Sequence, residues 1–167
     1  MADFETELAI GIGTLTGGIK SITVMEKDEK SELKQSLIIR KDRAWQIGIN
    51  WALRGGMLDL HWLDIRGKWV VNAYLEGLGK DAQETDHNGD TAKGILVEPP
   101  MLITKDPKTL QTEWQYSETF TFAPDSVKTG AYKLVVAITY EHDPGKPGPM
   151  AGFIEFPSMI QVYDPGD

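Results

Sequence analysis

Apolar side chains occupy every second position over several stretches of this chain. Successive side chains of a β-strand point to opposite faces, so such alternation predicts a strand with one buried face. The clearest example is the series Trp45, Ile47, Ile49, Trp51 and Leu53. The same pattern recurs in residues 69–75, 114–122 and 132–140, and more briefly in 8–12, 22–24 and 37–39.

Turn-forming residues separate these stretches. A turn is expected at 16–18, another at 40–43, and Pro157 is expected to divide the last strand region, 153–163. No stretch predicts a helix of three turns, and residues 57–65 fit either an irregular strand or a short helical turn. The chain is therefore expected to form one all-β domain over residues 1–167. Regular strand spacing without helices favours an antiparallel two-sheet β-sandwich of about eight to ten strands.

The C-terminal third contains a further signal. Residues 125–130 are rich in turn formers, and Gly130 leads into Tyr132 and a long alternating strand. This order resembles the tyrosine corner of immunoglobulin-like sandwiches, in which a Tyr at the start of the penultimate strand bonds to backbone just upstream. The resemblance covers about residues 112–163 and concerns architecture, not a particular family. It implies an immunoglobulin-like sandwich with a core Trp, for which Trp51 and Trp69 are the candidates.

Charge and composition narrow the classes of partner. The 167 residues carry a formal net charge of −8 and include no cysteine. An acidic surface repels phosphates, so no nucleic-acid partner is expected. The basic residues in 27–43 alternate with acidic ones and predict a solvated turn. No apolar run is long enough to span a membrane, and the chain is expected to be soluble and cytoplasmic.

Two polar segments are expected to be long loops. Residues 77–94 contain few apolar side chains, and residues 142–149 are rich in Pro and Gly. Long loops on a rigid scaffold commonly carry recognition. The residues expected to contact a partner are His142, Asp143, Lys146, Trp62 and Tyr74.

One candidate metal site lies in the first of these segments. Asp86, Asn88 and Asp90 place oxygen-bearing side chains at alternate positions, as a calcium site requires. The EF-hand template fails further along, because its sixth and twelfth positions are Thr91 and Val97. A hydrated Asn-Gly turn is the competing interpretation. The three histidines have no zinc-ligand spacing.

No catalytic motif is present, and no catalytic residue or cofactor is expected. Nucleophile-elbow, P-loop and dinucleotide-binding patterns are absent. The acid of most interest is Glu118, because it shares the strand parity of Tyr116 and Phe120. An inward carboxylate is a candidate acid, but the favoured interpretation is a position near a strand end or a sheet edge, or after a bulge that reverses the parity.

Three hypotheses on function follow. The first is a non-enzymatic interaction module that uses its loops to bind a protein partner or a second copy of itself. The second is a sandwich that binds carbohydrate or calcium, with Trp62 and Tyr74 as the aromatic residues free for a sugar. The third is a hydrolase with a carboxylate or His site.

Overall fold

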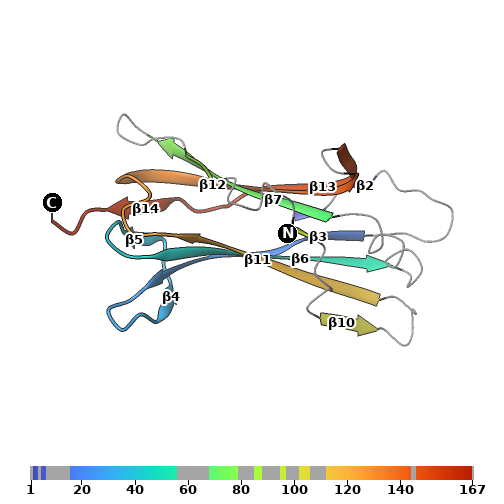
Figure 1. Ribbon diagram of the computed structural model, residues 1–167, viewed down its shortest axis with the longest axis horizontal. Coiled ribbons are helices and arrows are strands. Elements are labelled where there is room, and N and C mark those ends of the chain that lie inside the picture. The colour runs from blue at the N-terminus through green and yellow to red at the C-terminus, as the bar shows by residue number, and fades with distance from the viewer. Residues whose placement is uncertain are drawn as a thin grey trace.

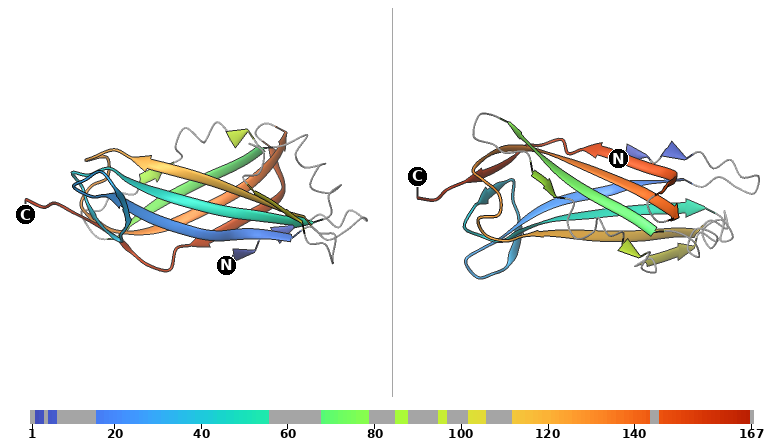
Figure 2. Two further views of the ribbon diagram at one scale, coloured as in Figure 1. Left: turned by 90° about the horizontal axis from the view of Figure 1, so that it is seen from below. Right: turned by 45° about the horizontal axis from the view of Figure 1, so that its top comes forward.

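The computed structural model is an all-β sandwich of two sheets. It describes residues 2–3, 5–6, 16–55, 68–78, 85–87, 95–96, 102–105, 112–143 and 146–166. Figure 1 shows the two sheets as layers, and Figure 2 shows that their strands cross at an oblique angle. The described residues contain no helix, and the prediction of an all-β sandwich of two sheets is confirmed.

Sheet A contains six strands within the described residues. Their order is β1 (Ala2–Asp3), β3 (Thr16–Lys27), β6 (Trp45–Gly55), β11 (Thr112–Phe122) and β10 (Leu102–Lys105), and β4 (Leu33–Gln35) pairs with the end of β3. Every pairing in this sheet is antiparallel. The three long strands, β3, β6 and β11, therefore form its centre.

Sheet B contains eight described strands. One path through it is β2 (Glu5–Thr6), β13 (Lys146–Glu155), β12 (Gly130–Asp143), β14 (Ile160–Tyr163) and β5 (Ile38–Arg40). On the other side of β12 lies β7 (Lys68–Leu78), which also pairs with β8 (Thr85–His87) and β9 (Ile95–Leu96). Most pairings are antiparallel, but β14 and β5 run parallel. The described residues thus form fourteen strands, more than the predicted eight to ten, and eight of the fourteen are segments of two to four residues.

The core lies between the sheets and consists of the alternating residues predicted from the sequence. In β12 the even-numbered residues from Tyr132 to Tyr140 are at most 1% exposed, whereas the odd-numbered ones are half-buried. Both candidate core tryptophans are buried, and their rings meet edge to face with centroids 6.0 Å apart. Trp51 also stacks on Tyr116, at a centroid distance of 5.5 Å. Large aromatic rings thus join the two sheets.

A β-bulge at Lys20 sets which face of β3 is buried. Ile19 pairs with Trp51 and Ser21 with Asn50, so Lys20 has no opposite residue. The extra residue reverses the parity of the strand. As a result, Ile19 and Val24 both reach the core although one is odd-numbered and the other even-numbered.

The tyrosine corner is present. Tyr132 is fully buried, and its hydroxyl donates a hydrogen bond of 2.8 Å to the backbone carbonyl of Lys128. Two residues earlier, Gly130 has φ of 153°, a conformation that residues with a Cβ rarely adopt. This glycine allows the chain to enter β12 directly from the corner.

Tyr132→Phe is expected to lower the free energy of unfolding by about 1–2 kcal/mol, because it removes a buried hydrogen bond and leaves the ring in place. Tyr163→Phe is the control, since Tyr163 is 38% exposed. Urea unfolding of both variants checks the prediction. Equal losses in the two variants would show that the corner contributes nothing.

One predicted turn and one predicted loop are instead parts of strands. The turn expected at 16–18 is wrong, because these residues belong to β3 and pair with residues 52–54 of β6. The long loop expected at 142–149 is also wrong. β12 continues to Asp143 and β13 begins at Lys146, so these strands form a tight hairpin. Pro147 and Pro149 lie in β13 before Met150, where the pairing with β2 begins. In this stretch the described residues place a strand on one side alone, and a missing N–H is tolerated at such an edge.

Candidate binding surfaces

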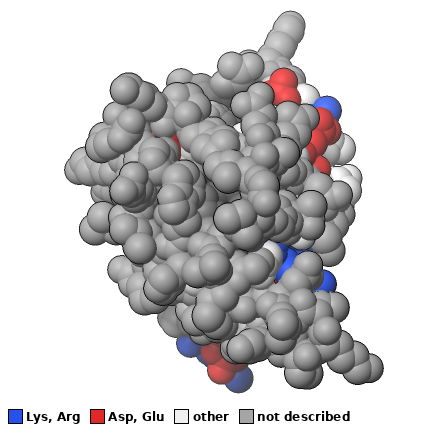
Figure 3. Space-filling view, turned by 90° about the vertical axis from the view of Figure 1, so that its right-hand side faces the viewer, with Lys and Arg blue, Asp and Glu red and all other residues white. Residues whose placement is uncertain are grey.

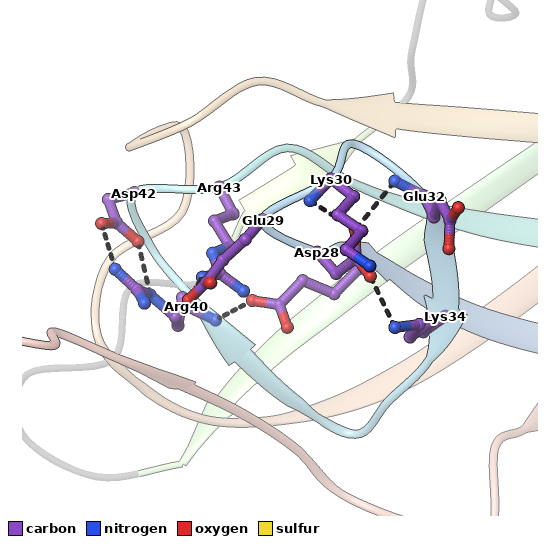
Figure 4. A network of polar contacts seen from close by, with 9 residues as sticks. Asp28, Glu29, Lys30, Glu32, Lys34, Arg40, Asp42 and Arg43 are labelled. Atoms are coloured by element: carbon purple, nitrogen blue, oxygen red, sulfur yellow. Dashed lines mark hydrogen bonds and ion pairs between the residues drawn. The ribbon is translucent and has the colours of Figure 1, made fainter.

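Ion pairs fill the turns at the end of the sandwich near the C-terminus (Figure 4). The carboxylate of Asp28 accepts hydrogen bonds from the backbone N–H groups of Lys30 and Glu32, at 2.8 and 2.9 Å. The guanidinium of Arg40 binds Asp42 through two hydrogen bonds of 3.0 and 2.7 Å. Further pairs join Lys34 to Asp28, Arg43 to Glu29 and Lys41 to Asp164.

These contacts account for the charged stretch that the sequence predicts to be a solvated turn. The hydrogen bonds with Lys34 and with Arg40 lower the pKa values of Asp28 and Asp42, respectively. In addition, Glu26 accepts a 2.7 Å hydrogen bond from the backbone N–H of Arg40, which ties β3 to β5 across the two sheets. We therefore assign this network to the fold and not to a ligand.

The outer face of sheet B carries apolar side chains. We define the sheet B patch as Val70, Tyr74, Val135, Ala137, Ala151 and Phe153. Cross-strand pairing places them together, since Val135 lies opposite Tyr74 and Ala137 lies opposite Phe153. Phe153 is 65% exposed and Ala151 is exposed, whereas the other four residues are half-buried. Two polar residues lie among them, Asn72 opposite Ala137 and Thr139 between Val70 and Ala151. Contiguous exposed apolar residues commonly mark an interaction surface.

A row of charged residues borders the sheet B patch. Lys133 lies opposite Glu76 on β7 and forms a 3.1 Å ion pair with Glu155 on β13. Glu141 lies on the same face, toward the hairpin. The charged residues placed around the patch are thus Glu76, Glu141 and Glu155, together with Lys133 and with Lys68, which lies opposite Glu141. The border of the patch is acidic.

The outer face of sheet A is polar and contains two adjoining hollows. Their volumes are about 180 and 370 Å³, and Lys20 and Glu113 line both. Gly18 and Ala52, which pair across β3 and β6, lie at the base of the smaller one. We define the sheet A hollow by its polar side chains, Lys20, Ser21, Asn50, Arg54, Glu113 and Gln115. Figure 3 looks onto the right-hand end of the molecule as drawn in Figure 1, where the visible charged atoms lie in a few small, separate groups.

Glu113 is the most enclosed charged group of the sheet A hollow. Its side chain is 12% exposed, and its carboxylate accepts hydrogen bonds of 2.8 Å from Gln115 and 3.1 Å from Arg54. The Nζ atom of Lys20 lies 3.8 Å away. The hydrogen bond from Gln115 lowers the pKa of Glu113, and the nearby charges of Lys20 and Arg54 lower it further.

A carboxyl group whose pKa is lowered by folding stabilises the protein above its ordinary pKa, which is 4.5 for Glu113. That stabilisation disappears as the pH falls through the lowered, folded-state value. Glu113→Gln is therefore expected to be less stable than the native protein at pH 7, with a difference that shrinks under acid conditions. Urea unfolding over a pH series measures this. A difference that is independent of pH would contradict the assigned interactions.

Glu118 lies at a sheet edge, one of the positions considered from the sequence. It pairs with the buried Ile49 and therefore shares the inward parity, yet it is only half-buried. In this part of β11 the described residues place a neighbouring strand on one side alone. The carboxylate turns back and accepts a 2.7 Å hydrogen bond from the N–H of Thr119. An inward charge of this kind discourages pairing with another strand.

Only some of the predicted site residues lie within the part of the chain that the structure describes. Tyr74 belongs to the sheet B patch. His142 and Asp143 end β12 and Lys146 begins β13, but their side chains lie outside the described residues, as does all of Trp62. Asp86 lies in β8, whereas Asn88 and Asp90 are not described. The described residues contain no cluster of three His, Asp or Glu residues suited to a metal ion.

Comparison with known proteins does not assign this chain to a family. No protein-family model matches the chain, and no curated protein matches it significantly in sequence. None of the described segments forms a helix of the length and apolarity needed to cross a membrane. Function is therefore argued from the two outer faces of the sandwich.

Proposed function

We propose that this protein is a non-enzymatic binding module whose sheet B patch binds a partner protein. The observation that carries the proposal is the exposed apolar surface around Phe153, which is 65% exposed. The outer face of an antiparallel sheet that meets only water is normally polar. Sheet A follows that rule with Gln46, Asn50 and Thr121 on its outer face, whereas sheet B places six apolar residues beside the polar Asn72 and Thr139.

The acidic border of the patch indicates the chemistry of the partner. Three acidic residues, Glu76, Glu141 and Glu155, and two lysines, Lys68 and Lys133, lie around it, and the whole chain carries a net charge of −8. Complementary charge speeds association and excludes wrong partners. The expected partner therefore presents an apolar surface with Lys or Arg at its rim. A second copy of this chain brings more carboxylates and fits less well.

The proposed recognition surface is a sheet face, whereas the sequence-based hypothesis placed recognition in the long loops. The predicted loop at 142–149 is a hairpin, and Tyr74 is the predicted contact residue whose side chain lies in the patch. A cysteine-free chain is compatible with a reducing compartment, and we propose a cytoplasmic location on that basis.

Selection of binders from a displayed library of short random peptides tests the proposal. We expect enriched peptides to combine apolar residues with Lys or Arg. Phe153→Asp should weaken their binding at least about tenfold, because the change removes the most exposed apolar ring and adds a further negative charge within an apolar surface. Thr121→Asp, on the outer face of sheet A, is the matched control and should bind normally.

The fold of each variant is checked by circular dichroism before binding is measured. Failure to enrich any peptide would overturn the proposal, as would binding that survives Phe153→Asp. Sedimentation velocity measures whether the native protein forms a dimer. A native dimer that Phe153→Asp dissociates would assign the patch to a second copy of the chain and refute a separate partner.

A further inference from the structure

The sheet B patch lies beside an edge of sheet B that the described part of the chain leaves open. β2 pairs with β13 only at Met150 and Ala151. The residues of β1, which precede β2, pair instead with β3 of sheet A. Over residues 152–155, β13 therefore has β12 on one side and no described strand on the other. We call these four residues the open edge of β13.

The hydrogen bonds between β12 and β13 determine which backbone groups this edge presents. Opposite residues of an antiparallel pair alternate between those bonded to each other and those whose N–H and C=O groups point away. Phe156 continues the register of the two strands and donates its N–H to the carbonyl of Leu134 at 2.8 Å. By this alternation Ile154 bonds to β12, whereas the N–H and C=O groups of Phe153 and Glu155 point outward. Two donors and two acceptors thus face the open edge.

Side chains block two other sheet edges within the described residues. On β5, the outward N–H of Ile38 donates to the hydroxyl of Ser36 at 3.2 Å. The next outward N–H of this strand, that of Arg40, donates to Glu26 at 2.7 Å. On β11, Glu118 places an inward charge at the edge. Such devices prevent pairing with another chain. The open edge of β13, by contrast, contains no Pro, no Lys and no inward charged side chain.

The side chains of the open edge indicate the sequence of a strand that pairs with it. Phe153 of the patch and Glu155, whose side chain is 55% exposed, both lie on the outer face of sheet B. An added strand places every second side chain on that face. One of these lies beside Phe153 and the next beside Glu155, which favours an apolar residue and a cation, respectively. Glu155 binds Lys133 at 3.1 Å, and a carboxylate accepts further hydrogen bonds.

We propose that the partner binds as an extended segment that adds a strand to the open edge of β13. This inference rests on the proposed function and specifies how the partner engages the sheet B patch. Main-chain hydrogen bonds to Phe153 and Glu155 supply affinity, and alternate side chains supply specificity. The partner segment therefore carries an apolar residue and a Lys or Arg two positions apart.

Amide hydrogen exchange, measured by NMR, tests whether the edge is open. In the free protein the amides of Phe153 and Glu155 are expected to exchange at least about tenfold faster than those of Gly152 and Ile154, which bond to β12. The tightest-binding peptide from the displayed library should then slow exchange at Phe153 and Glu155. Protection of these two amides in the free protein would overturn the proposal, as would exchange that the peptide leaves unchanged.

N-methylation of the same peptide, one residue at a time, tests the added strand. Binding is expected to weaken at least about fivefold at alternate residues only, because every second N–H faces β13. Glu155→Pro and Glu155→Ala form a matched pair. Both remove the carboxylate, but only proline removes the outward N–H, so Glu155→Pro should bind at least about fivefold more weakly than Glu155→Ala. Circular dichroism checks that both variants fold.

The outcomes separate this inference from the proposed function. Binding that Phe153→Asp abolishes but that N-methylation affects at no residue, or at all residues alike, would retain the patch and overturn the added strand. Equal binding by Glu155→Pro and Glu155→Ala would do the same. Failure to enrich any peptide would overturn both proposals. A native dimer in sedimentation velocity that Glu155→Pro dissociates would assign the open edge to a second copy of the chain and refute a separate partner.

Discussion

Replacing Val136 by aspartate is expected to unfold the protein, whereas the same change at its neighbour Val135 leaves it folded. Val136 is fully buried at the centre of β12, between β7 and β13. A carboxylate placed there has no partner, and burying an unpaired charge in a core costs more than about 4 kcal/mol. Val135 lies on the outer face, where the new carboxylate remains in contact with water and changes stability by less than about 1 kcal/mol.

Both variants replace a valine of β12 by aspartate, and the two positions differ only in the face of the sheet on which the side chain lies. Circular dichroism and urea unfolding measure both variants. Equal destabilisation of the two would show that β12 does not alternate between core and surface. The folded Val135→Asp variant then serves a second purpose, because it places a charge within the sheet B patch and should lose the peptides selected by the native protein.

Trp51→Ala is expected to lower the free energy of unfolding by about 3–5 kcal/mol, because it opens a large cavity between the sheets. The indole is 2% exposed, stacks on Tyr116 and meets the edge of Trp69 from the opposite sheet. Its removal therefore loses contacts both within sheet A and across the core.

Trp51→Phe is expected to cost less than about 2 kcal/mol. The Nε1–H group of Trp51 is buried and has no hydrogen-bond partner among the described residues, and an unpaired buried donor is itself unfavourable. Phenylalanine keeps most of the ring packing and removes that donor. Urea unfolding of the two variants side by side tests both statements. A loss from Trp51→Phe as large as that from Trp51→Ala would show that the donor is satisfied in solution.

Local patterns in the sequence were sufficient to predict the central strands β6, β7, β11 and β12. Side-chain alternation is a property of consecutive residues, so the series from Trp45 to Leu53 and from Tyr132 to Tyr140 could be read directly. The tyrosine corner was predictable for the same reason, because Tyr132 and the carbonyl it binds are only four residues apart.

Features that depend on cross-strand pairing were not predictable from the sequence. Gly17 and Gly18 suggested a turn, but they lie in β3 opposite β6, where small residues leave room for the sheet A hollow. The bulge at Lys20 gave no signal, because it is defined only by pairing with β6. Likewise, Pro and Gly in 146–149 suggested a loop, although β12 provides a partner strand for a hairpin.

The binding surfaces were missed for a related reason. Phe153 was assigned to a strand, and its exposure follows only from its pairing with Ala137 on the outer face of β12. Lys20, Arg54 and Glu113 come together from three separate strands. The one available signal was the apolar character of Val135 and Ala137, which lie at outward positions of a strand where polar residues are usual.

Cysteine scanning along β12 tests the central claim most directly. The chain has no cysteine, so single replacements at residues 133–138 each introduce one thiol, and its rate of labelling by a maleimide reports its exposure. We predict rapid labelling at 133, 135 and 137, and labelling at least about tenfold slower at 134, 136 and 138, which react only when the sheet opens. Uniform rates, or slow labelling at every third or fourth position, would contradict a two-sheet sandwich with an exposed outer face on sheet B.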